Sequence, residues 1–283
     1  MPSAFAKALL LVLVLCLGLV LAQTRSVSDP QGLALAVRAS AAMAGQTSIQ
    51  DIALTGSVNR VDGKAMERGV ATLKALFSGE ARVDLDFASG RGGEMYSFST
   101  GGPRGAWIGS DGKQNPISFH NALVDVGWFA PLLVLERIGA GTHGVVVTST
   151  GSAVQDGKSL HVLHVAVPIP GPNASKHPAW IRTLLEHAGQ FDLKLDSATL
   201  LPVEMTFNGH PDNNVRRDLP VRIHYSDYRA VSGILVPFRI RKYVNNGLMY
   251  DIRIETVAFN TGLNVSAFDV QAVQNLREQE PKP

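Results

Sequence analysis

The sequence is nearly free of cysteine. Its single cysteine, Cys16, lies in an apolar stretch near the N-terminus of the 283 residues. The rest of the chain therefore has no thiol for a disulfide, for nucleophilic catalysis or for binding a soft metal ion. An exported chain without disulfides is more typical of a bacterial periplasm or cell surface than of a disulfide-stabilised extracellular domain.

A large excess of charge of either sign is also missing. The chain carries 26 lysine and arginine residues against 24 aspartate and glutamate residues, which gives a formal net charge of +2. The segment Arg91-Gly92-Gly93 is an isolated fragment of the arginine-glycine tracts that bind nucleic acids. Because so little net charge accompanies it, we expect no nucleic-acid partner.

The longest apolar run, Ala8 to Ala22, is short for a membrane span. About fifteen residues at ~1.5 Å each cover about 22 Å of a hydrocarbon core about 30 Å thick. Lys7 precedes the run, and Val20 and Ala22 place small residues where signal peptidase requires them. This pattern predicts a signal peptide over residues 1–22 and export to the periplasm or the envelope surface, with a retained membrane anchor as the alternative.

Alternation of apolar and polar residues recurs along the chain and predicts strands with one apolar face. The apolar members of the clearest segments are Val83, Leu85, Phe87; Phe191, Leu193, Leu195; Val203, Met205, Phe207; Val221, Ile223, Tyr225; and Tyr250, Ile252, Ile254. Such segments are typical of an antiparallel sheet whose apolar face must be covered by helices, a second sheet, its own curvature or a ligand.

Turn and helix signals divide the rest of the sequence. Ser28-Asp29-Pro30 predicts a helix with a hydroxyl cap that ends at Gly45, and a second helix is expected over Ala179 to Ala188. Short strands with glycine-rich turns are expected over 49–59, 69–77, 81–87, 94–100, 105–109, 144–150 and 159–167, followed by four or five more between Phe191 and Phe259. No long linker interrupts this pattern, so we expect one domain over residues 23–274 and a disordered tail over 275–283.

The stretch from Phe119 to Ile138 is apolar on nearly every side. Pro131 in its middle predicts two short helices or one broken helix. Because so apolar a segment is unsuited to a solvent-washed surface, we expect it to lie on the apolar face of the sheet with a further apolar group on its other side. The candidate ligand-binding residues are those of this segment and of the inward strand face: Trp128, Phe129, Leu132, Leu135, Phe207, Tyr225, Phe238 and Ile252.

Catalytic and metal-binding patterns are weak. His161 and His164 are three apart in a strand, so their side chains leave opposite faces and cannot share a metal ion. The loop that starts at His210 lacks the ligand spacing of a calcium site and is interpreted as a hydrogen-bonded turn. Asp84 and Asp86 share a strand face without a positioned base, which favours a solvated face with cross-strand cations. We therefore expect no enzyme activity, no metal ion and no cofactor.

The last strands resemble a known pattern. A strand ends in an acidic turn, a proline begins the next strand, an SDYR strand follows, and a glycine turn precedes a PF strand. The segments that carry these features are 196–203, 220–229 and 233–240, and Phe259-Asn260 and Ala267-Phe268 fit the close of the pattern. This pattern is similar to the C-terminal strands of the LolA-like, outer-membrane lipoprotein-sorting superfamily of bacterial exported proteins. The resemblance implies a mainly β (α+β) fold, an unclosed antiparallel half-barrel with helices covering its concave apolar face, and an activity of holding acyl chains.

The sequence thus predicts a non-catalytic monomer that binds a lipid or the acyl chain of a lipoprotein. Two alternatives use the same fold. A regulatory protein of the envelope stress response would bind an inner- or outer-membrane protein through its convex surface. A structural envelope protein would have its apolar face filled by its own helices and would have no cavity.

Overall fold

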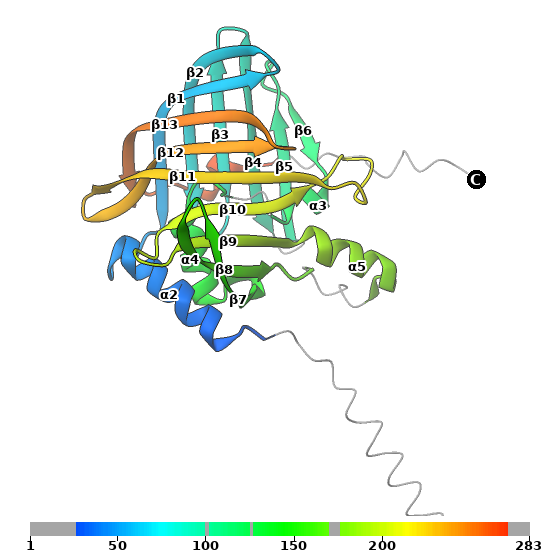
Figure 1. Ribbon diagram of the computed structural model, residues 1–283. Helices are drawn as coiled ribbons and strands as arrows, with labels where there is room; N and C mark the ends of the chain where they lie inside the picture. The colour runs from blue at the N-terminus through cyan, green and yellow to red at the C-terminus, as the bar shows by residue number, and fades with distance from the viewer. Residues whose placement is uncertain (1–26, 100–101, 125–126, 170–175, 271–283) are drawn as a thin grey trace, which may run out of the picture.

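A computed structural model describes residues 27–99, 102–124, 127–169 and 176–270 (Figure 1). The expected signal peptide and the expected tail lie outside these ranges. So do Thr100, the last residue of the strand expected over 94–100, and Val126, which belongs to the apolar segment Phe119 to Ile138. Within the described residues, no helix combines the length and the apolar character that crossing a membrane requires.

Thirteen strands form one sheet in the described part of the chain. Their bounds are β1 Asp51–Asp62, β2 Ala65–Leu76, β3 Ala81–Phe87, β4 Gly90–Ser99, β5 Gly102–Ile108, β6 Gln114–Ile117, β7 Val146–Gln155, β8 Lys158–Ala166, β9 Gln190–Asp196, β10 Pro202–Gly209, β11 Leu219–Val231, β12 Ile234–Val244 and β13 Gly247–Phe259. The helices are α2 Pro30–Ala44, α3 Phe119–Ala122, α4 Pro131–Ala140 and α5 Ala179–Ala188, with short 3-10 turns at Thr142–Gly144 and Val265–Phe268.

The sheet consists of two antiparallel meanders joined through β1 and β13. The strand order is β6-β5-β4-β3-β2-β1-β13-β12-β11-β10-β9-β8-β7, so β6 and β7, which are consecutive in sequence, lie at opposite edges. The segment between them contains α3 and α4. The sheet is therefore an unclosed half-barrel, as the resemblance implied, and the chain crosses its opening through these helices (Figure 1).

The junction of the two meanders depends on Gly56. The register between β1 and β13 shifts between Thr55 and Gly56. A Cβ at Gly56 would lie 2.0 Å from the backbone oxygen of Arg253, so no other residue fits there without moving a strand. A bulge increases the local twist of a strand. This bulge lies between β1 and β13, the two strands that join the meanders.

The predicted strand faces are mostly confirmed. Burial alternates without a break along β3, β9 and the first half of β11. In β10 the prediction for Val203 was wrong, because the register shifts between Pro202 and Glu204 and the Glu204 side chain becomes buried instead. The short strand β6 was not predicted, since Gln114–Ile117 shows no alternation.

Helix α2 begins at an aspartate cap. The Asp29 carboxylate accepts hydrogen bonds from the backbone N–H groups of Gln31 and Gly32, at 3.1 Å each, and also from Ser149 of β7 at 3.0 Å. The expected hydroxyl cap was wrong: the Ser28 hydroxyl accepts instead from the Val147 N–H. The cap thus starts the helix and fixes it to an edge strand.

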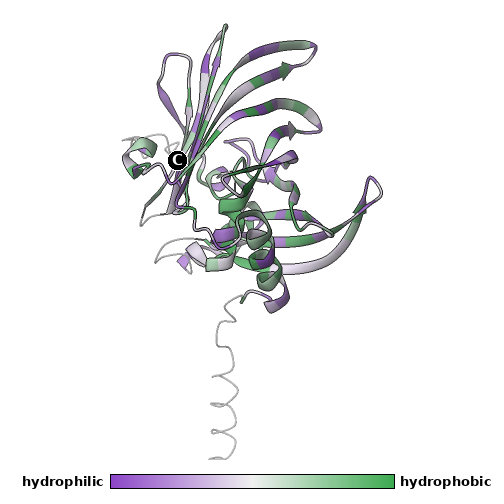
Figure 2. Ribbon diagram, turned by 90° about the vertical axis from the view of Figure 1, so that its left-hand side faces the viewer, coloured by the Kyte–Doolittle hydropathy of each residue, from purple (hydrophilic) through white to green (hydrophobic). Residues whose placement is uncertain are grey.

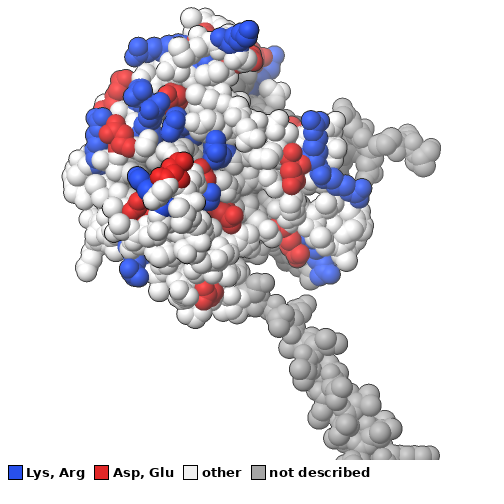
Figure 3. Space-filling view, viewed as in Figure 1, with Lys and Arg blue, Asp and Glu red and all other residues white. Residues whose placement is uncertain are grey.

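The outer face of the sheet carries charges of both signs. Cross-strand ion pairs join Arg239 to Asp251 at 2.8 Å and Lys194 to Glu204 at 2.7 Å. Figure 3 shows lysine and arginine side chains interspersed with acidic ones over this side of the molecule. Asp86 pairs across strands with Arg91, as expected for a solvated face, whereas Asp84 pairs with Arg82 of its own strand β3.

Candidate ligand cavity

A cavity of about 390 Å³ lies on the concave side of the half-barrel. Its walls come from both meanders and from the segment that crosses the opening. The lining residues are Val83, Leu85, Gly93, Glu94, Trp107, Ile108, Asn121, Val124, Trp128, Phe207, Gly209, His210, Leu219, Val221, Lys242, Val244, Met249 and Tyr250. Most of these side chains are apolar, which is the usual lining of a small-molecule site.

The cavity opens to solvent at one end. Trp107 and Met249, which both line it, are 41% and 37% exposed. Trp107 lies opposite Glu94 in the ladder between β4 and β5, so both side chains leave the sheet on the same face. These two apolar side chains form a partly exposed rim at the entrance.

A buried polar group interrupts the apolar lining. The indole N–H of Trp128 donates to Oε1 of Glu94 at 2.5 Å, and Nζ of Lys242 lies 3.6 Å from the same oxygen. The Lys242 ammonium is also 4.6 Å from the centre of the Trp128 ring. Glu94 and Lys242 are each only 5% exposed, so the attraction between them offsets part of the cost of placing two charges where there is little solvent.

Strand pairing explains why two charges point inward. Glu94 is opposite Val83, a buried residue of the concave face. Lys242 is opposite Ile223 on one side and Tyr250 on the other. Burial, and next the charge of Glu94, raise the pKa of Tyr250 above its ordinary value. The tyrosine hydroxyl is therefore a neutral hydrogen-bonding group in the wall of the cavity.

Two of the eight candidate ligand-binding residues line this cavity, Trp128 and Phe207. Five others lie in the core without lining it: Phe129, Leu132, Leu135, Tyr225 and Ile252. Phe238 is only partly buried, and its ring centre lies 4.6 Å from the Arg229 guanidinium carbon. The cavity therefore lies beside the predicted cluster and shares two of its residues.

The structure corrects the expectation that the apolar segment needs an external group to cover it. Trp128, Phe129, Leu132 and Leu135 are between 0 and 3% exposed in the protein alone. Helix α4 packs against α2, which supplies Leu35, Ala36, Ala39 and Met43 to the same core. Figure 2 shows these apolar helices between the two arms of the sheet. Pro131 begins α4, so the predicted break into two short helices is confirmed.

The sequence carries a signal for the buried polar group. Glu94 and Lys242 lie at inward positions of their strands, where a period-two pattern calls for apolar residues. In β4 the pattern is obscured by Gly90, Gly92 and Gly93, which carry no side chain. In β12 the even positions Ile234, Val236 and Ile240 lead directly to Lys242, and a charge that continues such a series marks a buried polar site.

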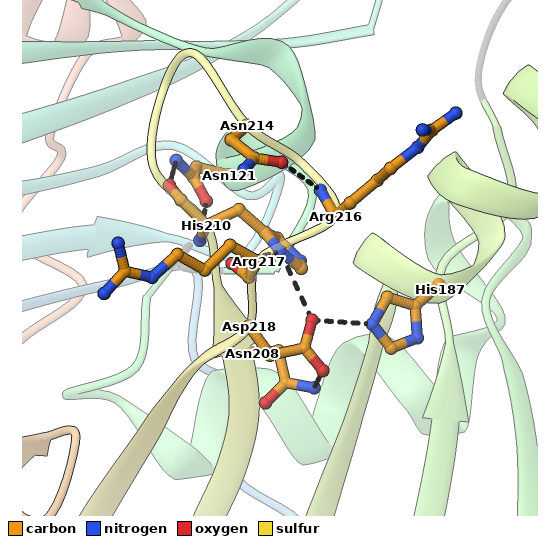
Figure 4. A network of polar contacts seen from close by, with 8 residues as sticks. All are labelled: Asn121, His187, Asn208, His210, Asn214, Arg216, Arg217 and Asp218. Atoms are coloured by element: carbon orange, nitrogen blue, oxygen red, sulfur yellow. Dashed lines mark hydrogen bonds and ion pairs between the residues drawn. The ribbon is translucent and has the colours of Figure 1, made fainter.

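The loop at His210 is a hydrogen-bonded turn, as expected. The Asn214 N–H donates to the Pro211 carbonyl at 2.9 Å, and the Arg216 N–H donates to the Asn214 side chain at 3.1 Å. The sequence did not indicate that this loop meets His187 of α5 and Asp218 (Figure 4). His161 and His164 leave opposite faces of β8, since their partners are Leu195, which is buried, and Asp192, which is not.

Solved structures share this arrangement of strands and helices. A protein domain assigned to outer membrane lipoprotein sorting, from Vibrio parahaemolyticus, superimposes with a TM-score of 0.53 at 14% identity, covering 84% of this chain and 96% of that one. The chain shares the fold of this domain. A DUF1329 family protein from Desulfovibrio piger gives a TM-score of 0.54 at 14% identity, covering 87% of this chain and all of that one. No family model and no curated protein matches the chain.

Proposed function

We propose that this protein is a non-catalytic binding protein for a lipid or for the acyl chain of a lipoprotein, exported to the bacterial periplasm or envelope. The observation that carries the proposal is the apolar cavity of about 390 Å³ in the concave side of the half-barrel. The fold is that of proteins named for lipoprotein sorting, and the predicted signal peptide and the absence of cysteine after Cys16 agree with export.

The cavity size suits a single chain or a small lipid. Each buried methylene contributes ~0.8 kcal/mol, so about ten methylenes supply roughly 8 kcal/mol before the entropy of association is subtracted. The Glu94 and Lys242 side chains, with the neutral hydroxyl of Tyr250, offer hydrogen bonds to a polar head group beside the apolar wall. Trp107 and Met249 at the rim would contact the ligand as it enters.

A cavity-filling substitution tests the proposal. Val244 lines the cavity and is partly buried, so Val244→Trp would fill the space without removing core atoms. We expect a fluorescent fatty acid to bind the purified protein at about micromolar strength and Val244→Trp to weaken it at least tenfold. Val154→Trp, at a position 76% exposed on the β7–β8 hairpin, serves as the matched control. Mass spectrometry of organic extracts from protein purified out of its native envelope identifies the natural ligand.

One observation favours a second candidate, a structural or regulatory envelope protein with a protein partner. Trp128, Phe129, Leu132 and Leu135 of the segment that crosses the opening are covered by the chain itself, so they do not need an acyl chain. If no acyl probe binds, and Val244→Trp leaves the properties of the protein unchanged, the cavity has no ligand and this second function replaces the first.

A further inference from the structure

Three side chains of types that can bind a metal ion come from separate elements and meet beside the cavity (Figure 4). His187 belongs to the last turn of α5, His210 follows β10, and Asp218 precedes β11. One ligand atom from each residue lies within 4.8 Å of the others. The strand pairing of β10 with β11 brings His210 and Asp218 together, and α5 adds His187 from the side.

The spacing agrees with a transition-metal site. Nε2 of His187 lies 3.0 Å from Oδ1 of Asp218, and Nδ1 of His210 lies 3.5 Å from the same oxygen. Ligands bound to Zn²⁺ at about 2.0–2.1 Å in a tetrahedron are roughly 3.3 Å apart. Two of the three separations are therefore close to those that an ion would impose, and the shorter one, between His187 and Asp218, is a hydrogen bond that a bound ion would replace.

Neighbouring groups hold two of these ligands in place. The Asn208 amide donates to Oδ2 of Asp218 at 2.9 Å, which leaves Oδ1 directed at the histidines. The backbone of His210 is fixed by the Asn121 side chain, which accepts from the His210 N–H at 2.9 Å and donates to its carbonyl at 2.8 Å. Hydrogen bonds of this kind orient the ligands in known metal sites.

His210 is buried without a full set of hydrogen bonds. Its side chain is 0% exposed, and among the described residues its Nε2 has no hydrogen-bond partner. Its Nδ1 lies 3.3 Å from the Arg217 carbonyl, which is long for a hydrogen bond. Because this contact is long, Nδ1, the ring nitrogen beside Asp218, is only weakly engaged and can give its lone pair to an ion.

We propose that His187, His210 and Asp218 bind a divalent transition-metal ion, for which Zn²⁺ is the probe, with a fourth position open to water. The ion would join α5 to the end of the β10–β11 hairpin. Among the residues of α5 only Ala188 is buried, so this helix has few other contacts to fix it. Because His210 also lines the cavity, the ion would stiffen one wall of it.

Isothermal titration of the tag-free protein with ZnCl₂ tests the proposal. We expect one ion per chain, and Mg²⁺ in excess should not compete because it prefers oxygen ligands. His187→Ala and Asp218→Asn alter side chains that are 46% and 42% exposed, so both variants should fold. Each should weaken Zn²⁺ binding at least about tenfold, and Asn208→Leu, which removes the carboxylate's partner, by about tenfold.

A histidine–aspartate pair elsewhere in the chain supplies the matched control. His164 Nδ1 lies 2.8 Å from Asp192 in neighbouring strands, and this pair is outside the three-residue group. His164→Ala should therefore keep the Zn²⁺ affinity of the unaltered protein. Absence of a one-to-one Zn²⁺ complex would overturn the proposal, as would equal weakening by His164→Ala, or Asp218→Asn binding as tightly as the unaltered protein. None of these results bears on acyl-chain binding, which Val244→Trp tests separately.

Discussion

The hydroxyl of Tyr225 donates a hydrogen bond to the backbone oxygen of Trp128 at 2.6 Å, and both groups are buried. Tyr225 lies on β11, while the indole N–H of the same tryptophan is bonded to Glu94 on β4. Trp128 is therefore attached to both meanders at once. In an unclosed sheet this connection across the opening limits how far the two arms can separate.

The Tyr225 hydroxyl should therefore contribute measurably to stability. Tyr225→Phe keeps the ring but leaves the Trp128 carbonyl buried without this donor, at a cost of about 1–3 kcal/mol. The measurement is the free energy of unfolding in urea. Tyr243→Phe, whose half-buried ring faces Arg222 on the outer side, should change it by less than about 0.5 kcal/mol. Equal effects of the two substitutions would contradict the role of the hydrogen bond.

The buried pair of Glu94 and Lys242 should be strongly coupled. Replacing one partner alone, by Glu94→Gln or Lys242→Met, leaves a buried charge and should cost about 3–5 kcal/mol. The double variant removes both charges, so it should be more stable than the sum of the single effects implies. A double-mutant cycle measured by urea unfolding gives the coupling. Additive effects would mean that solvent, rather than the partner, compensates each charge.

The sequence allowed the sheet and its inward face to be predicted because apolar alternation reflects one-sided burial directly. Val83, Leu85 and Phe87 are all buried, as their spacing indicated. The same rule failed at Val203 because a register shift inserts an extra residue, and nothing in the local sequence marks the shift. Bulges change the face of later residues without changing composition.

The site was harder to predict because it depends on contacts between distant segments. Helix α2, Pro30–Ala44, covers the apolar segment, and sequence patterns do not show that α2 packs on α4. The group of His187, His210 and Asp218 arises only when α5 meets the end of β10. The sequence did show each residue type, but not the topology that joins them.

The inward face of the C-terminal strands makes a graded prediction. Ile252 is 0% exposed, so Ile252→Asp buries a charge in the core and should cost several kcal/mol or prevent folding. Phe238 is only partly buried and lies beside the Arg229 guanidinium, which would compensate a carboxylate there. Phe238→Asp should therefore lower the thermal midpoint by clearly less than Ile252→Asp. An unchanged midpoint for Phe238→Asp would show that this ring adds nothing to the packing.

Glu136 on α4 should make stability fall as the pH rises. Burial raises its pKa to about 7, against the hydrogen bond from the Ile49 N–H, which lowers it. Below its unfolded pKa, near 4.5, the side chain is protonated in both states and carries no penalty. As the pH rises towards 7 the unfolded chain ionises first, so stability declines, and the full penalty applies above pH 7. Glu136→Gln should therefore stabilise the protein at pH 8 by on the order of 1–3 kcal/mol and change little at pH 4, measured by urea unfolding.

The exposed Glu186 on α5 supplies the control for this pH dependence. Glu186→Gln removes the same charge from a solvated position, so it should alter the free energy of unfolding by less than about 0.5 kcal/mol at both pH values. The decisive quantity is the difference between pH 8 and pH 4 for each variant. If Glu136→Gln shows the same small difference as Glu186→Gln, the Glu136 carboxylate ionises freely in the folded protein and α4 does not bury it.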